Sequence, residues 1–262
     1  MVTRARLDAE LVRRGLARSR GQAAELIEQG LVAIRGVTAD KAATVVDRDT
    51  PVTVVATAER QWASRGAHKL IGALDALAVD PAGMRCLDAG ASTGGFTDVL
   101  LDRGAAQVVA VDVGYGQLVW RLRSDARVQV HDRTNVRALT PAEIGGPVQL
   151  TVADLSFISL RTVLPALAAC TEGVLLPMVK PQFEVGKQRL GAGGVVRDPA
   201  LRLAALCDVA AAARELGLRL AGAVASPLPG PSGNVEFFLC LRRDGGDVGD
   251  AALAAAVEAG PS

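Results

Sequence analysis

The chain has 262 residues, 50% of them hydrophobic, which is enough for one large or two modest packed cores and excludes disorder of the whole. The formal net charge is +1, so the overall charge does not indicate a nucleic-acid-binding protein, and the local distribution of charge has to be considered. No apolar run approaches the roughly 20 residues of a membrane-spanning helix, and charges stand where a signal peptide would be apolar.

The first part of the chain has a local excess of arginine. Residues 3–29 contain two short helical patterns, and Ser19 can cap the second, with Gln22 completing a capping box. Alternating segments at 31–34 and 51–55 predict short strands. A single arginine here is more often part of a solvated helix face, but together they supply the positive face that phosphate contact requires. The charged residues among the first twenty are Arg4, Arg6, Arg13, Arg14, Arg18 and Arg20 against Asp8 and Glu10.

The rest of the chain alternates strand and helix patterns. An amphipathic helix opening at Lys69 leads to the first strand, and the last two strands are expected to form a hairpin. This predicts an α/β fold, a doubly wound Rossmann-like sheet preceded by a small N-terminal α+β domain. Strands are expected near 84–88, 107–112, 127–131, 148–154, 173–180, 218–225 and 235–241. The expected divisions are an N-terminal domain at 1–58, a linker at 59–65, the α/β domain at 66–245 and an alanine-rich tail with a frayed helix at 246–262.

The four cysteines predict a reducing environment. Each stands alone in an apolar segment, without the close spacing of a metal site or the pattern of a secreted disulfide framework. We therefore expect buried thiols in a cytoplasmic protein and no metal site. The cysteines are Cys86, Cys170, Cys207 and Cys240.

A glycine turn between two predicted strands indicates a ligand site. The sequence Leu-Asp-Ala-Gly-Ala-Ser-Thr-Gly-Gly-Phe-Thr at 87–97 follows a buried strand and opens a helix, and Asp112 ends the next strand. Ser92 stands where the dinucleotide fingerprint has its second glycine, which disfavours a nicotinamide cofactor. The pattern suits S-adenosylmethionine. Asp112 would accept hydrogen bonds from the ribose hydroxyls, and Asn135 or Asp132 would lie near the adenine. The alternative is a turn of this type that binds no ligand. The expected cofactor-binding residues are Asp88, Gly90, Ser92, Thr93, Gly94, Phe96, Asp112 and Asn135.

Polar residues at the ends of the predicted strands form the candidate catalytic set. Asp154 and Lys180 each end a strand, Glu236 begins the last one, and Lys69 lies on the helix before the first. In an open α/β sheet the ligand lies at the carboxyl ends of the strands. A lysine at a strand end can instead extend its stem over apolar surface, an alternative that the presence of Asp154 weakens. The glycine-rich connection at 181–198 is predicted to lack regular structure, and such long loops are usually functional.

Motifs of one known family run through both halves of the chain. The pattern Arg-Leu-Asp-x-x-Leu-x-x-Arg-Gly-Leu-Ala-x-Ser-Arg-x-x-Ala from Arg6, followed by Ile-x-x-Gly-x-Val, resembles the small RNA-binding domain named for ribosomal protein S-four. The candidate catalytic set resembles the Lys-Asp-Lys-Glu tetrad of ribose 2'-O-methyltransferases of the FtsJ/RrmJ type. As a whole, residues 3–242 resemble the TlyA (haemolysin A) family of ribosomal RNA cytidine 2'-O-methyltransferases. The further motifs that carry this resemblance are Ser-Arg-Gly-Ala-His-Lys-Leu, Ala-Asp-Leu-Ser-Phe-Ile-Ser, Val-Lys-Pro-Gln-Phe-Glu and Pro-Gly-Pro-Ser-Gly-Asn-Val-Glu-Phe.

The resemblance implies S-adenosylmethionine-dependent methylation of cytidine in 16S or 23S ribosomal RNA, or both, within 30S and 50S subunits, by a cytoplasmic monomer. A ribose hydroxyl is a very weak acid, so its attack needs a base or a charge that favours the alkoxide. A lysine can supply either when burial or a nearby ammonium lowers its pKa. Lys180 is the expected base, with Lys69 as the neighbouring cation, Glu236 orienting both and Asp154 balancing their charge; no metal is required. RNA contacts are expected from Arg4, Arg6, Arg14, Arg18, Arg20 and Arg65.

Two other functions stay open at this point. A non-enzymatic ribosome-binding or assembly factor could keep the fold, although the intact tetrad argues against it. A haemolysin-type, membrane-active protein is suggested by the family's other name, although no strongly amphipathic basic helix is evident. One departure from the family concerns the linker, where the usual Arg-x-Trp-Val reads Arg60-Gln-Trp-Ala63. Loss of the β-branched residue is expected to loosen the packing of the linker.

Overall fold

The computed structural model describes residues 4–17, 19–28, 30–54, 61–230 and 233–261. The chain divides into two compact units, residues 1–61 and residues 62–262, and each is described by itself. Arg18, Arg60 and the expected domain boundary at 58/59 lie outside the described residues. Among the described residues, no helix combines the length and the apolar character that crossing a bilayer requires.

The N-terminal unit is a small α+β domain. Its core contains Leu7 and Leu11 from the first helix and Ile27 from the second, each at most 2% exposed. The predicted cap is present, since Ser19 Oγ accepts a hydrogen bond from the backbone N–H of Gln22 at 3.2 Å. The elements are β1 (Arg4–Arg6), α1 (Leu7–Arg13), α2 (Arg20–Glu28), β2 (Val32–Ile34), β3 (Val37–Thr38), β4 (Val45–Asp47) and β5 (Val52–Val54).

The strands of this unit form two small antiparallel sheets. In one sheet β2 pairs with both β3 and β5, and in the other β1 pairs with β4. The two helices and the strands near 31–34 and 51–55 are confirmed. The strands β1, β3 and β4 go beyond the prediction, because two or three residues are too few to display a period of two.

The second unit is built on one seven-stranded sheet with the order β11-β12-β10-β9-β6-β7-β8. Neighbours from β10 to β8 are parallel, whereas β12 is antiparallel to both β10 and β11. The predicted doubly wound α/β sheet with an antiparallel terminal pair is confirmed. The strands are β6 (Arg85–Ala89), β7 (Gln107–Val111), β8 (Val128–His131), β9 (Val148–Ala153), β10 (Thr171–Val179), β11 (Arg219–Ala225) and β12 (Phe237–Arg242).

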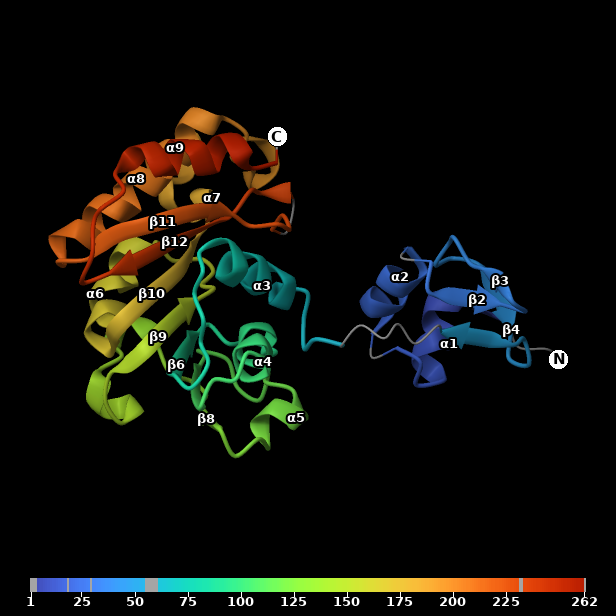
Figure 1. Ribbon diagram of the computed structural model, residues 1–262. Coiled ribbons are helices and arrows are strands. Elements are labelled where there is room, and N and C mark those ends of the chain that lie inside the picture. The colour runs from blue at the N-terminus through green and yellow to red at the C-terminus, as the bar shows by residue number, and fades with distance from the viewer. Residues whose placement is uncertain (1–3, 18, 29, 55–60, 231–232, 262) are drawn as a thin grey trace. The chain divides into compact units, whose positions relative to one another are not determined.

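Helices cover both faces of this sheet, as Figure 1 shows. Successive residues of a strand point to opposite faces, so that Cys86 and Leu87 of β6 pack in different cores. One core lies against α3, α4 and α5, and the other lies against α6, α8 and α9. The helices are α3 (Gly66–Ala76), α4 (Gly95–Asp102), α5 (Trp120–Arg123), α6 (Leu160–Cys170), α7 (Pro181–Glu184), α8 (Pro199–Glu215) and α9 (Asp250–Ala259).

Two segments differ from the expectation. The connection at 181–198 is not structureless: it holds α7 and two 3-10 turns, η3 (Lys187–Arg189) and η4 (Ala192–Gly194), and Val185 and Val196 are buried in a small core with Ala205. Glycines gave this segment a loop-like composition, but its valines anchor it. The alanine-rich tail forms α9, whose Leu253 and Val257 belong to one of the two cores of the sheet rather than to a frayed end.

The strand order places a crevice between β6 and β9. The direction in which the chain adds successive strands to the sheet reverses there: β7 and β8 follow on one side of β6, whereas β9, β10 and β12 lie on the other. At such a point the loops after the two strands separate and leave room for a ligand. In addition, Val179 at the end of β10 pairs with Phe237 at the start of β12. The residues next to them, Lys180 and Glu236, therefore come to the same edge of the sheet as the loop after β9.

Candidate active site

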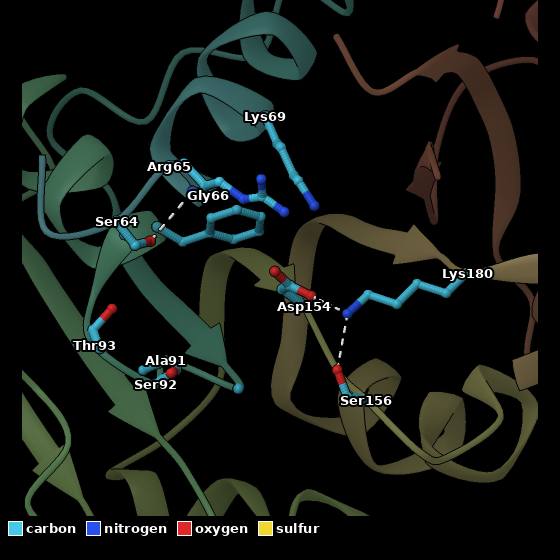
Figure 2. Close-up of a pocket in the computed structure, with 13 residues that line it drawn as sticks. Ser64, Arg65, Gly66, Lys69, Ala91, Ser92, Thr93, Asp154, Ser156 and Lys180 are labelled. Carbon is cyan, nitrogen blue, oxygen red and sulfur yellow. Dashed lines mark hydrogen bonds and ion pairs between the residues drawn. The ribbon is translucent and has the colours of Figure 1, made fainter. Parts of the chain in front are cut away.

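A cavity of about 280 Å³ opens at this edge of the sheet. Figure 2 shows side chains from three places entering it: the segment before α3, the glycine turn after β6, and the ends of β9 and β10. Three of the four candidate catalytic residues and four of the candidate cofactor residues line it. The lining residues are Ser64, Arg65, Gly66, Lys69, Gly90, Ala91, Ser92, Thr93, Gly95, Phe96, Asp154, Ser156 and Lys180.

Lys180 is held by two oxygen atoms from the loop after β9. Its Nζ lies 2.6 Å from Asp154 Oδ1 and donates a hydrogen bond to Ser156 Oγ at 3.0 Å. The side chain of Lys180 is 9% exposed, and that of Asp154 is 27% exposed. In Figure 2 the ammonium points from the end of β10 toward these two oxygens. A charge-assisted pair with so little exposure keeps the ammonium at one place in the cavity wall.

Lys69 and Glu236 form a second, more deeply buried pair. Lys69 Nζ lies 2.5 Å from Glu236 Oε2, and the two side chains are 7% and 0% exposed. The second carboxylate oxygen, Oε1, is buried and has no hydrogen-bond partner among the described residues. Gly230 makes room for it, because a Cβ at that position would lie 2.2 Å from Oε1. The structure thus pairs Glu236 with Lys69, whereas the carboxylate beside Lys180 is that of Asp154.

The glycine turn brings backbone close to the loop after β9. Gly90 has φ +89°, and a Cβ there would lie 2.4 Å from the carbonyl oxygen of Asp154. Gly94, just before α4, has φ +101°, and a Cβ there would lie 2.4 Å from a methyl group of Leu122. Only glycine fits both positions without displacement of neighbours. Ser92 also has a positive φ, +47°, which is unusual for a residue other than glycine and belongs to the same tight turn.

Asp88 lies beneath this turn and is fully buried. Thr97 Oγ1 donates a hydrogen bond to Asp88 Oδ2 at 2.6 Å, whereas Asp88 Oδ1 has no partner among the described residues. Burial raises the pKa of Asp88 to about 7, and the hydrogen bonds from Thr97 oppose this rise. Because a carboxyl group with so high a pKa is easily protonated, Asp88 contributes less negative charge to the site than its sequence position suggests.

Asp112 and Asn135 lie outside the residues that line this cavity. Asp112 accepts hydrogen bonds from the backbone N–H of Ser92 at 2.8 Å and of Gly114 at 2.6 Å, so it ties the glycine turn to the loop after β7. Asn135 Oδ1 accepts from the N–H of Arg137 at 3.0 Å and caps the 3-10 turn η1 (Val136–Ala138). Both side chains therefore have structural contacts of their own.

Ser156 and Phe183 were not singled out from the sequence, whereas Phe157 was expected to pack near the adenine or in the core. Ser156 contacts Lys180 directly, although its motif gave no sign of that contact. Phe157 is 91% exposed with φ +65°, and its ring centroid lies 5.3 Å from that of Phe183. An exposed phenylalanine with a positive φ is unusual, since both features are unfavourable in a plain surface loop. Phe157 stands three positions beyond Asp154, and its 91% exposure argues against the core position that the sequence left open.

Three of the arginines expected to contact RNA, Arg4, Arg6 and Arg20, each have an acidic partner. Arg4 Nε lies 3.3 Å from Asp47 Oδ1, and its side chain is 75% exposed. Arg6 and Arg20 share Asp8, at 3.1 and 2.9 Å, and are 50% and 60% exposed. The hydrogen bond from Arg6 is the main reason that the pKa of Asp8 falls to about 2. The basic face that the sequence predicts is thus partly neutralised.

Arg14 is used inside the domain. Its side chain is 19% exposed, and its Nε donates to Glu10 Oε1 at 2.8 Å. The same guanidinium donates to the backbone carbonyls of Thr50 and Arg48, each at 2.8 Å. Arg14 therefore fastens α1 to the turn before β5, and little of it is left for an RNA contact.

A buried carboxylate fastens the linker to the second unit. Asp98 of α4 is fully buried, and its Oδ2 accepts a hydrogen bond from the backbone N–H of Ala63 at 2.9 Å. Both of its oxygens also accept from the guanidinium of Arg121, at 2.7 Å for Oδ1. Ala63 itself is 7% exposed and packs in the same core as α3 and α4. The residue that departs from the family's linker pattern is thus held through its backbone.

Comparisons with known proteins agree with this architecture. Residues 62–243 match the model of the FtsJ-like methyltransferase, and residues 5–52 match that of the S4 domain. A Mycobacterium tuberculosis protein named "16S/23S rRNA (cytidine-2'-O)-methyltransferase TlyA" is 66% identical over 92% of this chain and 91% of its own length. "Hemolysin A" of Brachyspira hyodysenteriae is 34% identical over 89% of this chain and 98% of its own.

A solved structure of a Streptococcus thermophilus protein superimposes with a TM-score of 0.77 at 35% identity, covering 98% of this chain and 96% of that one. The FtsJ-like match extends over the whole described part of the sheet, and the sequence identity to the first relative runs through both units. The chain therefore belongs to the TlyA family, proteins that join an S4 domain to an FtsJ-like methyltransferase domain.

Proposed function

We propose that this protein transfers a methyl group from S-adenosylmethionine to the 2'-hydroxyl of a cytidine in ribosomal RNA. The observation that carries the proposal is the meeting of two lysine–carboxylate pairs with a glycine turn around one cavity. The name of the 66% identical relative supplies the substrate class. The set of four residues supplies the chemistry, since a ribose hydroxyl becomes a nucleophile only with help from a base or a positive charge.

The cavity suits the methionine end of the cofactor. The turn at Gly90, Ser92 and Thr93, whose side chains are small or absent, lines it, and the N-terminus of α4 follows directly. Arg65 and the first residues of α3 border the same space and would attract the carboxylate of the methionine moiety. Asp112 remains the proposed partner of the ribose hydroxyls and Asn135 of the adenine. When bound, S-adenosylmethionine supplies an electrophilic methyl group.

The residues of the chain then position and deprotonate the acceptor. Lys180 Nζ, held by Asp154 and Ser156, is the proposed base: once it has lost a proton, its neutral amine takes the proton of the 2'-hydroxyl and becomes the ammonium again. Lys69, fixed by Glu236, places a second positive charge at the same cavity and favours the alkoxide over the alcohol. Phe157, exposed beside this set, gives the acceptor nucleotide an apolar surface. Holding the acceptor in line accounts for a large share of the acceleration, up to about 7–11 kcal/mol in favourable systems.

The S4 domain is the proposed second contact with ribosomal RNA. Its exposed Arg4 can exchange Asp47 for a phosphate at small cost, because surface ion pairs contribute at most about 1 kcal/mol. Arg6 and Arg20 share the buried Asp8, so phosphates bound by their exposed guanidinium groups would have to leave one of the two bonds to Asp8 in place. Arg18 remains a candidate from the sequence. The relative's name covers both 16S and 23S RNA, and we propose that this enzyme acts on both 30S and 50S subunits in the cytoplasm, as a monomer.

Methyl transfer by variants of Lys180 tests the proposal. Tritium from labelled cofactor is counted in separate 30S and 50S subunits, and cofactor affinity is measured by calorimetry. Lys180→Ala should lower transfer by at least about 10²-fold with unchanged cofactor affinity. Lys180→Arg is the matched variant: it keeps a positive charge for Asp154 but does not accept a proton, so it should be as inactive. Near-normal transfer by either variant would refute the assignment of the base.

The names of the Brachyspira relative, "Hemolysin A", and of the Streptococcus thermophilus structure, "Putative hemolysin", are the observations in favour of a second function, membrane lysis. Leakage of a dye from liposomes exposed to the pure protein tests it directly. Lysis that persists in the Lys180→Ala variant would establish an activity separate from methyl transfer.

A further inference from the structure

The segment Lys180-Pro-Gln-Phe-Glu184 ends in a buried carboxylate that the proposed reaction does not use. Glu184 closes the one-turn helix α7, and its side chain is 1% exposed. Its Oε2 accepts a hydrogen bond from Ser159 Oγ at 2.6 Å, and its Oε1 accepts from the backbone N–H of Leu160 at 2.7 Å. Removing a carboxylate from water is costly, so these two short bonds have to compensate for its burial.

The partners of Glu184 lie at the end of the loop that holds Lys180. Ser159 is the N-cap of α6 and Leu160 is its first residue. The loop 154–159 runs from Asp154 to this cap and carries Ser156 on the way. Glu184 therefore caps α6 from a different element and fixes the far end of the loop from which both oxygen partners of Lys180 come.

The helix α7 meets this loop at three places. At its start, Lys180 reaches Asp154 at 2.6 Å. In its middle, the ring of Phe183 lies 5.3 Å from that of Phe157. At its end, Glu184 holds the cap of α6. Because one rigid turn of helix carries all three contacts, a change at the last of them is transmitted to the first.

We infer that Glu184 is a positioning residue for methyl transfer: it keeps the loop 154–159 docked on α7, so that Asp154 and Ser156 hold the ammonium of Lys180 at the cavity wall. The inference rests on the role proposed for Lys180. A residue that only stabilises α6 would affect the stability of the protein and not the reaction. If Glu184 is a positioning residue, its loss should loosen the loop 154–159 and misplace Lys180 Nζ, while the glycine turn and the S4 domain stay intact.

Glu184→Gln tests the inference in the full-length protein. The amide keeps one acceptor oxygen for Leu160 N–H and turns an NH2 group toward Ser159 Oγ, so the bond to Ser159 has to reverse its direction and both bonds lose the assistance of the negative charge. We expect kcat for transfer to ribosomal subunits to fall about 10- to 100-fold, the effect of a misplacement of about 1 Å. The Kd for S-adenosylmethionine and the KM for subunits should stay within about twofold, since neither the glycine turn nor the S4 domain depends on this contact.

Two further variants make the test specific. Asp208→Asn is the matched control: Asp208 shares Arg161 with Glu184, at 3.9 and 3.7 Å, but it is exposed and belongs to α8. Its kcat should equal that of the wild type. Ser159→Ala removes one small hydroxyl from the other side of the same contact, so it is expected to fold even if Glu184→Gln does not. It should lower kcat in the same direction, and the double variant should be little worse than Glu184→Gln alone.

The possible outcomes distinguish the role of Glu184 from the proposed function of Lys180. A lower Tm with unchanged kcat in Ser159→Ala or Glu184→Gln, measured well below the Tm, would mean that the contact only stabilises α6 and would overturn the inference. If Lys180→Ala stays active, the proposed function of the site fails first. If Lys180→Ala is inactive while both loop variants keep full kcat, only the role of Glu184 is refuted.

Discussion

Asp98→Asn probes the contact that fastens the linker to the methyltransferase domain. The wild-type carboxylate is fully buried and accepts hydrogen bonds from the N–H of Ala63 and from the guanidinium of Arg121. Asparagine keeps one acceptor oxygen and turns an NH2 group toward a donor, so at least one charge-assisted bond is lost, worth about 1.5–3 kcal/mol. Arg121 is 46% exposed and can be rehydrated, which keeps the cost below that of a stranded buried charge.

The net expectation for Asp98→Asn is a loss of about 2–4 kcal/mol in the free energy of unfolding. For a domain of this size that corresponds to a Tm lower by about 5–15 °C. Urea unfolding of the full chain, followed by the fluorescence of Trp62 and Trp120, reports on this domain because both tryptophans belong to it.

Asp75→Asn is the control for Asp98→Asn. Asp75 pairs with Arg103 at 2.8 Å, but the two side chains are 56% and 37% exposed, and such pairs contribute about 0–1 kcal/mol. Equal midpoints and equal slopes for the two variants would show that burial of Asp98 adds nothing and would refute the reasoning.

Two further predictions concern the glycine turn and the S4 domain. Gly90→Ala should lower methyl transfer at least about tenfold, because its Cβ would lie 2.4 Å from the Asp154 carbonyl oxygen. Gly83→Ala is the control, since Gly83 has a similar positive φ of +72° but open space around the added Cβ. Equal methyl-transfer activities of the two variants would contradict the prediction. Hydrogen bonds, chiefly from Arg13, hold the pKa of Glu10 at about 2, below its usual 4.5, so the wild type should keep this stabilisation above pH 4.5 and lose it as the pH falls toward 2. Glu10→Gln should cost about 1–2 kcal/mol at pH 7, allowing for the 47% exposure of Arg13, and amide exchange in α1 that is as slow in the variant as in the wild type would contradict this.

Much of the fold follows from local sequence patterns. Several strands of the large sheet contain compact apolar runs, such as Val108-Val-Ala-Val111, and such runs are recognisable without tertiary information. The position of the site follows as well, because residues at the ends of parallel strands meet at one edge of the sheet. The FtsJ-like and S4 matches confirm the two domain types that the motifs indicated.

The contacts within the site depend on tertiary register and could not be read from the sequence. Whether Glu236 pairs with Lys69 or with Lys180 is decided by the pairing of β12 with β10 and by the space at Gly230. Similarly, the arginines of the first helices looked equivalent, yet Arg14 turns inward because backbone carbonyls near β5 come within its reach. Composition also misled at α9, where alanines suggested a frayed tail but Leu253 and Val257 are buried.

The pair of Lys69 and Glu236 joins residues 167 positions apart in the chain. Glu236 reaches its place only when β12 enters the sheet between β10 and β11, so the two pairs around the cavity are complete only at a late stage of folding. The described strands and helices of the S4 domain, in contrast, lie within residues 4–54, and they can fold while the rest is still being synthesised. During translation, the S4 domain, which is proposed to bind RNA, therefore emerges from the ribosome well before the complete methyltransferase domain, which is proposed to modify it. A chain that ends before β12 would keep the S4 domain but lack Glu236. Such a truncated product would be expected to bind ribosomal RNA without methylating it.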